Sequence, residues 1–556
     1  MECEGGYVFM NQIETALKQA LANAVKVSFD VELAPEGIVI EIPKDKSHGD
    51  YSTNVAMQLT RTLKNNPRKI AEAILEALDK DSASIESCEI AGPGFINFKI
   101  KSTSLAQVIS RVLEEGDAYG TNNSGNGLKV NVEYVSANPT GDLHLGHARG
   151  AAWGDSITRL MKASGYDVTR EYYVNDAGNQ IVNLGKSLQA RYREHLGLSF
   201  VLPEDGYHGE DVKKIAIELA EEYKDRYVEE TEENLKFFKE KGIEFELAKI
   251  RKDLDNFRVH FDVWSSEQKI RDDGKVEKAL DVLAEKGLSY EQDGALWFAT
   301  TKFGDDKDRV LRKTDGSYTY LVPDIAYHKD KLDRGFDLLV DLLGADHHGY
   351  IPRLKASIEA LGNDPDKLQV DIIQMVRLVE NGEEVKMSKR LGNAVTIREL
   401  CEEVGVDAVR YFFVQRAVDT HFDFDLGLAR KQSNDNPVYY AQYAHARICS
   451  ILRQAPEFKE AQSYELLTHE KEISLMKYIN EFTNVVSDAA KTRAPHKVCN
   501  YIQKLAQYFH SFYNACKVID PQQEELSAQR LALLKATKIT LKNALNLVGV
   551  EAIEKM

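Results

Sequence analysis

The sequence predicts an α/β fold in which a Rossmann-type parallel sheet with a helical insertion lies between a small N-terminal α+β domain and an all-α C-terminal bundle. Two strand-like segments, Val130–Val135 and Val168–Val174, flank a helix-like segment, which is typical of a βαβ unit. The pattern resumes at Leu338–Leu343 and Leu368–Gln374, and such apolar runs indicate strands buried on both faces of a sheet. From Asn436 onward, apolar residues recur at helical spacing, which favours a bundle.

The segment before the sheet combines helical and strand-like patterns. Ile13, Ala16 and Leu17 have helical spacing, whereas Ile38–Ile42 is strand-like. A polar, glycine-rich stretch at residues 120–127 indicates a domain boundary. A charged, largely helical stretch separates the two halves of the sheet and is the predicted insertion. We therefore expect an N-terminal α+β domain at 10–118, a Rossmann-type domain at 127–395 with an insertion at about 185–310, a connecting helical segment at 396–435 and a helical domain at 436–556.

The composition is that of a water-soluble globular protein. Of 556 residues, 43% are hydrophobic and 29% are charged, and no stretch approaches the length of about 18 apolar residues that a membrane-spanning helix needs. The net charge of −17 argues against a non-specific nucleic-acid coat but leaves room for a local basic face. The six cysteines include no C-x-x-C pair, so we expect neither a zinc site nor a disulfide framework, and a reducing cytoplasm fits best.

The first candidate site is the loop from Ser136 to His147, between a predicted strand and a predicted helix. Ligands bind at such strand ends in open α/β sheets, and a helix N-terminus favours an anion. His144 and His147 are three residues apart, so both can face one phosphate, while Gly146 permits close approach of a nucleotide. A lone H-x-x-H is more often structural or accidental.

The second candidate site is Lys386-Met387-Ser388-Lys389-Arg390. It follows the hairpin signal Asn381-Gly382 and precedes a capping box that begins at Thr396. Three cations on one loop suit a ligand that carries pyrophosphate, although a solvated basic loop is the simpler interpretation of this run alone.

Together, H-L-G-H and K-M-S-K-R resemble the two signature sequences of class I aminoacyl-tRNA synthetases. Four longer strings are similar to the arginyl-tRNA synthetase family in particular: residues 132–150, 173–180, 344–350 and 436–447. The resemblance spans about residues 10–556 and implies an enzyme that activates L-arginine with ATP and transfers it to tRNA(Arg). It also implies a tRNA-binding N-terminal domain, a helical anticodon-binding domain and a need for bound tRNA in the first step.

The resemblance and the charge of the reaction together assign the catalytic groups. His144 and His147 would bind the α-phosphate and bridging oxygens, and Lys386 and Lys389 the β- and γ-phosphates, with Mg²⁺ sharing the charge. Gly146, Met387 and Ser388 complete the expected nucleotide site, and no metal held by the protein itself is expected. Arg390 departs from the serine that is common in the family at this position, which adds a cation.

The resemblance also implies an arginine pocket. Guanidinium pairs bidentately with carboxylate, and Glu133 and Asp324 match the substrate carboxylates of the family. The other expected substrate contacts are Tyr320 along the pocket, Asn138 and His347 at the α-amino and carboxylate end, and Ser136. Without the resemblance, a cap or turn role for Asp324 is equally good.

Several alternatives remain at this stage. They are another class I synthetase, such as that for cysteine or glutamine, a small-molecule adenylyltransferase, and a non-catalytic tRNA-binding relative. Gly178–Ser187 looks like a P-loop but has six residues between its glycines instead of four, so it favours a helix. In the C-terminal segment, Tyr439, Tyr440, Tyr443 and Arg447 suit stacking on RNA bases, although a core role is the commoner one. We expect a monomer, no membrane contact, and a sheet that stays folded in a chain ending near Asp435.

Overall fold

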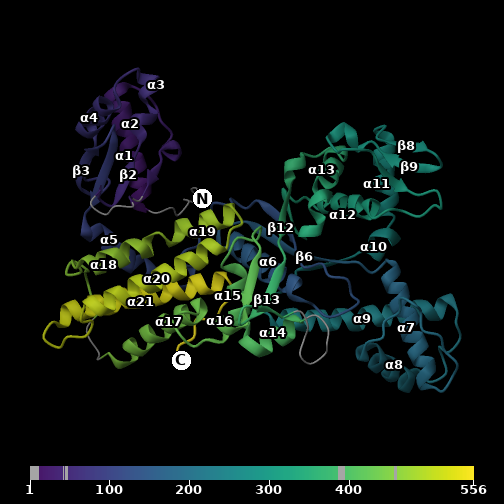
Figure 1. Ribbon diagram of the computed structural model, residues 1–556. Helices are drawn as coiled ribbons and strands as arrows, with labels where there is room; N and C mark the ends of the chain where they lie inside the picture. Colours follow the sequence, from purple (N-terminus) through teal and green to yellow (C-terminus); the bar gives the residue numbers. More distant parts are fainter. Residues whose placement is uncertain (1–11, 42, 44–47, 386–394, 456–459) are drawn as a thin grey trace, which may run out of the picture.

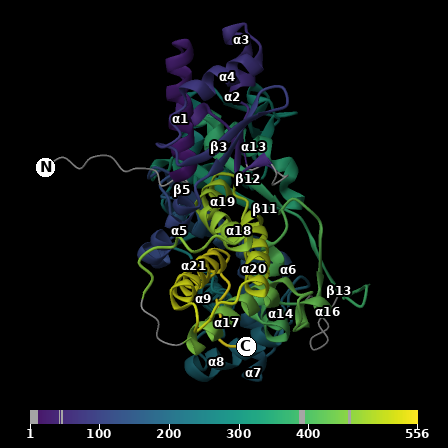
Figure 2. The same cartoon turned by 90° about the vertical axis from the view of Figure 1, so that its left-hand side faces the viewer.

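The computed structural model describes residues 12–41, 43, 48–385, 395–455 and 460–556. Figures 1 and 2 show an extended arrangement, with the N-terminal domain and helices α7 and α8 at opposite ends of the molecule. The central sheet and the C-terminal bundle lie between them (Figure 1). In the described part of the chain, no helix is both long and apolar enough to cross a membrane.

The central sheet has five parallel strands in the order β12-β11-β5-β6-β7. The chain builds outward from β5 on both sides, so the strand order reverses between β5 and β11. Ligands bind outside the carboxyl ends of strands at such a switch point. The predicted α/β fold with a Rossmann-like sheet is therefore confirmed, with strands β5 (Lys129–Glu133), β6 (Asp167–Val174), β7 (Val263–Ser266), β11 (Leu338–Gly344) and β12 (Leu368–Ile373).

Helix α6 (Leu145–Ala163) follows β5 and is buried almost all round. The sequence predicts one apolar face, at Trp153, Ile157 and Leu160, and these side chains are indeed buried. The opposite side is covered as well, because α15 (Val406–Val414) and α19 (Phe482–Lys491) pack against it. The first helix of the sheet is therefore also a helix of the C-terminal core.

The segment between β6 and β11 is not wholly an insertion. β7 pairs in parallel with β6 in the central sheet, although the sequence assigns residues 185–310 to the insertion. The pattern Val-Trp-Ser-Ser is too short and polar to predict a buried strand. The remaining elements are helices α7 (Asn179–His195), α8 (Glu210–Tyr223), α9 (Glu232–Asn256), α10 (Glu267–Asp272) and α11 (Lys275–Glu285), and the antiparallel strands β8 (Ser289–Gln292), β9 (Ala295–Phe298) and β10 (Arg309–Arg312). The helix favoured over a P-loop is found as α7.

Two helices after this insertion complete the sheet region, α12 (Leu321–Asp333) and α13 (Ile351–Ala360). The hairpin predicted at Asn381-Gly382 joins β13 (Val376–Glu380) to β14 (Glu383–Glu384), and both turn residues have positive φ. β13 also pairs in parallel with β15 (Phe422–Asp425), a strand in the segment 396–435 that the sequence describes as helical. The capping box predicted at Thr396 is present at the start of α14 (Ile397–Val404).

The N-terminal domain is an antiparallel sheet of order β1-β2-β4-β3 covered by helices, with its own hydrophobic core. Asp50 and Glu14 of this domain contact Lys477 and Asn484 of the bundle. Its elements are α1 (Gln12–Phe29), β1 (Ile40–Glu41), β2 (Tyr51–Thr53), α2 (Val55–Gln58), α3 (Thr60–Leu63), α4 (Pro67–Ala77), β3 (Ile85–Ala91) and β4 (Phe95–Ile100), and α5 (Ser102–Glu115) leads to the central sheet.

The C-terminal bundle shares one hydrophobic core with the sheet, which runs from Val130 and Val132 to Leu505 and Leu541. The end of the chain adds polar ties, since fully buried Arg410 donates to the Val548 carbonyl and to Asp155 of α6. We therefore revise the sequence-based expectation: a chain ending near Asp435 would expose this core and should not keep its sheet stably folded. Helix α16 (Leu426–Arg430) packs on β13, β15, α14 and α15, and the bundle comprises α17 (Pro437–Gln454), α18 (Glu470–Asn480), α19, α20 (His496–Ala515) and α21 (Glu524–Leu547).

Candidate active site

The loop after β5 ends in a histidine pair at the N-terminus of α6. His144 is the N-cap residue, and its ring lies 3.8 Å from that of His147, centroid to centroid. The Gly146 N–H donates to His144 Nδ1 at 3.2 Å, and the His144 N–H donates to His147 Nδ1 at 3.3 Å. A Cβ on Gly146 would lie 3.1 Å from the His144 ring, so this position favours glycine for the packing of the ring as well.

These contacts fix the tautomer of both rings. Each Nδ1 accepts a backbone N–H, so the ring proton of each neutral imidazole is on Nε2. Burial lowers the pKa of His144, and burial together with the neighbouring His144 lowers the pKa of His147 to about 4. At neutral pH the pair therefore presents two uncharged N–H donors at the switch point of the sheet.

The chain enters this loop through strained backbone. Val135 has φ of 70° and Ser136 has φ of 40°, both in the left-handed region, which is unusual for a β-branched residue. Such strain concentrates at functional sites, where the surrounding structure holds it in place. The Ser136 hydroxyl donates to Glu133 Oε1 at 3.0 Å and accepts from the Tyr173 N–H at 3.1 Å, which ties the turn to β6.

The start of α14, which follows the second motif in the chain, contacts the loop of the first motif. Thr396 forms an antiparallel bridge with His144, and the Ile397 N–H donates to the Leu143 carbonyl at 2.8 Å. Helix α14 thus begins beside the histidine pair. Lys386, Met387, Ser388 and Lys389 lie outside the described residues.

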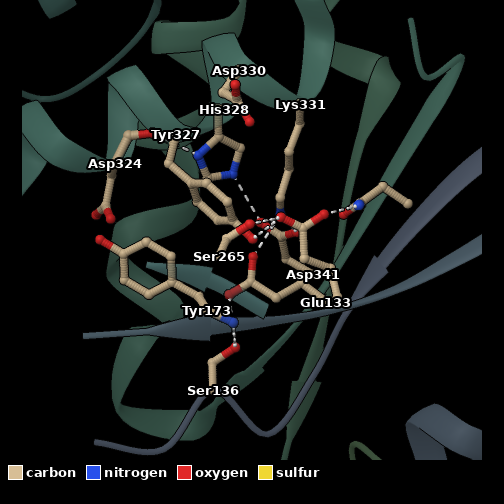
Figure 3. Close-up of polar contacts among 12 residues, drawn as sticks. Glu133, Ser136, Tyr173, Ser265, Asp324, Tyr327, His328, Asp330, Lys331 and Asp341 are labelled. Carbon is tan, nitrogen blue, oxygen red and sulfur yellow. Dashed lines mark hydrogen bonds and ion pairs between the residues drawn. The ribbon is translucent and has the colours of Figure 1, made fainter. Parts of the chain in front are cut away.

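Asp324 lies in the first turn of α12, and its carboxylate is hydrogen-bonded but forms no ion pair among the described residues. Its Oδ2 accepts the Tyr350 hydroxyl at 2.5 Å, and among the described residues no cation forms an ion pair with it. Burial raises the pKa of Asp324 to about 6, while the Tyr350 hydrogen bond and the charge of His328 lower it. Figure 3 shows the Asp324 carboxylate beside the hydroxyl end of the Tyr173 side chain. Such a carboxylate is suited to a cationic ligand.

Glu133, by contrast, already has a cation. Its Oε2 accepts from Lys331 Nζ at 2.5 Å, and its Oε1 accepts the Ser136 hydroxyl. The two carboxylates that the sequence assigns to one pocket therefore differ in their surroundings. Glu133 is held in a buried ion pair, and Asp324 is left for an external partner.

Lys331 belongs to a network that the sequence analysis missed. It is fully buried, and its Nζ also donates to Asp341 Oδ1 at 2.9 Å (Figure 3). His328 Nε2 contacts Asp341 Oδ2 at 2.9 Å. Asp341 is the only polar residue in the apolar run of β11, and this break was the available signal. On α12, the spacing of residues 324, 328 and 331 places these side chains on one face.

The remaining expected substrate contacts lie at the surface. Tyr320 is 82% exposed at the N-terminal end of α12, so among the described residues its side chain does not line the pocket in this conformation. Asn138 is exposed and donates to Gln180 of α7 at 2.9 Å. His347 is exposed beside Asp346. Within the described ranges, no group of three or more His, Cys, Asp or Glu side chains could hold a metal ion.

Models of three protein families match successive parts of this chain. The "Arginyl tRNA synthetase N terminal domain" matches residues 11–100, the "tRNA synthetases class I (R), catalytic domain" matches 108–415, and the "DALR anticodon binding domain" matches 441–556. The catalytic model alone covers more than half of the chain. The chain belongs to the arginyl-tRNA synthetase family of class I.

Individual relatives agree with this assignment. The chain is 61% identical to the arginine–tRNA ligase of Bacillus subtilis over 98% of this chain and 99% of that protein. The identity to the arginine–tRNA ligase of Geobacillus kaustophilus is 58% over 98% of each chain. The fold matches the solved Thermus thermophilus arginyl-tRNA synthetase with a TM-score of 0.75 at 22% identity, covering 98% of this chain and all of that one.

Proposed function

We propose that this chain, as an arginine–tRNA ligase of class I, performs both steps of its reaction at the carboxyl end of β5. In the first step, the carboxylate of L-arginine attacks the α-phosphate of ATP, the bond to the bridging oxygen breaks, and pyrophosphate leaves. In the second step, the arginyl group passes from the adenylate to the 3′-terminal ribose of tRNA(Arg), and AMP leaves. The observation that carries this proposal is the neutral histidine pair in the loop after β5, together with a carboxylate on α12 that forms no ion pair among the described residues.

The histidine pair would stabilise charge that develops on ATP. Donors that are fixed before the reaction stabilise a transition state because they need not reorganise. The Nε2–H groups of His144 and His147 are fixed by their Nδ1 contacts, and we assign them to the α-phosphate and bridging oxygens. Lys386 and Lys389 are assigned to the β- and γ-phosphates, with Gly146, Met387 and Ser388 completing the nucleotide site. Mg²⁺ is proposed to arrive with ATP, because Mg²⁺ in such sites is bound largely through substrate phosphates.

The carboxylate pocket would select arginine. We assign Asp324 to direct contact with the guanidinium, and Glu133 to the same pocket, where Lys331 and Ser136 already orient it. Asn138 and His347 are assigned to the α-amino and carboxylate groups at the mouth of the pocket. Tyr320 would line the pocket only after its side chain turns inward on binding.

The tRNA would extend over the helical bundle. The rings of Tyr439 and Tyr443 on α17 are parallel, with centroids 6.3 Å apart, and the Arg447 guanidinium lies 4.5 Å from the centre of the Tyr513 ring. All four side chains are half-buried, so their outer faces are open. Aromatic and arginine planes of this kind stack on unpaired bases, and we propose them as contacts for the anticodon loop. We further propose a cytoplasmic monomer.

Pyrophosphate exchange into ATP tests this function directly. With each standard amino acid, and with or without tRNA(Arg), we expect exchange with arginine alone, and only when tRNA is present. Exchange with a different amino acid would contradict the assigned specificity, and exchange without tRNA would contradict the proposed dependence on tRNA.

A further inference from the structure

A buried chain of charges lies directly behind the proposed arginine pocket. His328, Lys331 and Asp341 are each at most 4% exposed, and the two cationic side chains contact different oxygens of the one carboxylate. Figure 3 shows how α12 directs His328 and Lys331 toward the sheet. The proposed chemistry uses Lys331 only to orient Glu133, and it uses neither His328 nor Asp341. Burying them is costly unless they are paired, so their role needs an explanation.

The contacts of His328 require a doubly protonated ring. Its Nδ1 lies 2.8 Å from the Asp324 carbonyl oxygen, which can only accept a hydrogen bond. Its Nε2 lies 2.9 Å from Asp341 Oδ2. Asp341 is ionised because Lys331 binds its other oxygen, so Nε2 also donates. Burial opposes the charge on the ring, but the Asp341 charge and hydrogen bond outweigh it and raise the pKa of His328.

This imidazolium is joined to the residue that would bind arginine. Its Nδ1–H donates to the backbone of Asp324 one helical turn earlier, and this contact holds the turn that carries the carboxylate. Its charge also counteracts the effect of burial on the pKa of Asp324. A carboxylate that must receive a substrate cation cannot keep a permanent ion pair, because the substrate would have to displace it. A cation bound to the backbone, and paired elsewhere, supports the charge without occupying the binding position.

We propose that His328 is a positioning residue for arginine, whose buried positive charge, fixed by Asp341, keeps the Asp324 carboxylate aligned and available for the substrate guanidinium. This inference rests on the proposed function and names a determinant of its specificity. Lys331 has the complementary task, because it pairs with Asp341 and so keeps that buried carboxylate from competing for the substrate, while its second contact orients Glu133 in the pocket.

The charged and titratable groups around the two residues define what a pH profile would report. Asp341 and Lys331 face His328 from β11 and α12. Tyr350, Glu133 and Glu267 act on Asp324 from η5 (Ala345–Tyr350), β5 and α10, respectively, in addition to His328. The carboxylates of Glu133 and Glu267 raise the pKa of Asp324, and the charge of His328 lowers it. Loss of the His328 charge should therefore raise the pKa of Asp324.

The test is the pH dependence of the KM for arginine in His328→Gln, measured by pyrophosphate exchange with tRNA present. Gln keeps a hydrogen-bond donor but removes the charge. We expect the pH below which the arginine KM rises to move upward by about one to two units, as for loss of one charge a few ångströms away. At pH 7 the KM should rise about twofold to tenfold and approach the wild-type value near pH 8.5, with kcat little changed. An increase of the same size at every pH would overturn the proposal.

Tyr327→Phe is the matched control, since it removes a buried hydroxyl contact with Glu171 on the same helix face without removing a charge. We expect its pH profile to keep the wild-type midpoint, and a shift equal to that of His328→Gln would overturn the proposal. The double variant completes a double-mutant cycle with Asp324→Asn. If His328 acts through Asp324, adding His328→Gln to Asp324→Asn should raise the KM for arginine almost no further. Additive effects would contradict it. If His328→Gln fails to fold, His328→Asn replaces it in both measurements. Pyrophosphate exchange by the wild type with arginine tests the proposed function itself, so the function and the role of His328 can fail separately.

Discussion

A pair of histidines and a single histidine lie near the same sheet, and they differ in charge: the pair is neutral and the single ring is a cation. His144 and His147 each accept a backbone N–H at Nδ1, so they are neutral donors. His328 has a carbonyl oxygen at one nitrogen and a carboxylate at the other, so it is a cation. The charge of each ring is set by the groups that contact its nitrogens, and the residue type alone does not determine it.

Neither histidine region simply carries the charge opposite to that of the substrate beside it. The neutral pair is proposed to face the anionic nucleotide, where the positive charge would come from Lys386 and Lys389. The cationic ring lies on the side of the cationic amino acid, but behind a carboxylate. The neutral pair would donate directly to the nucleotide, whereas the cationic ring would orient the carboxylate that binds arginine. The charge state of each region suits that role.

The largest expected effect is on the carboxylate that has no cation of its own. In Asp324→Asn the guanidinium would lose its anionic partner, which costs about 3–5 kcal/mol for a buried pair. We expect kcat/KM for arginine to fall about a thousandfold, the preference over citrulline to narrow, and the KM for ATP to stay unchanged. Steady-state exchange with both amino acids measures this.

Asp330→Asn is the matched control for that variant. Asp330 lies on the same helix, but its carboxylate pairs with Lys275 and Arg334 away from the pocket. If Asp324 only shaped the first turn of α12, its variant would lose melting temperature and keep the wild-type preference for arginine. That result would contradict the pocket assignment.

The second expected effect is on the neutral pair. His147→Ala removes one fixed donor, so we expect adenylation to slow by about 10²–10³ with little change in the KM for arginine. Part of any loss could come from the helix cap, because His147 also caps the N-terminus of α6. His469→Ala controls for this, since His469 caps α18 in another capping box distant in the chain. A near-normal rate with a raised KM for arginine would show that the donor role is wrong.

The third expected effect is a pH dependence that separates the two regions. Asp324 has a raised pKa of about 6, so its charge is lost as the pH falls through that value. Below pH 6 the KM for arginine should rise about tenfold per unit. His147 has a lowered pKa of about 4, so it stays neutral, and single-turnover adenylation at saturating arginine should stay flat from pH 5.5 to 8. A rate that fell together with arginine affinity near pH 6 would mean that one group controls both.

Sequence patterns predicted the local motifs of the site better than the buried side-chain contacts around them. The strand-loop-helix around His144 and the capping box at Thr396 follow from local spacing, and both are present. Lys331 and His328 could not be recognised as buried, because charged residues on a helix usually face solvent. Their partner Asp341 is close in sequence, but its contacts depend on how α12 packs on β11. Tyr320 shows the reverse case: its motif suggests a pocket side chain, but its position before the first turn of α12 leaves it exposed.

The protonation state of the histidines can be read directly by ¹⁵N–¹H NMR on protein labelled at histidine, with each resonance assigned from its His→Gln variant. The structure predicts that His144 and His147 are neutral with the proton on Nε2 at pH 7. It predicts that His328 is protonated on both nitrogens from pH 5.5 to 7. A neutral His328 at pH 6, or a charged His147 at pH 7, would contradict the proposed division of roles between the two regions.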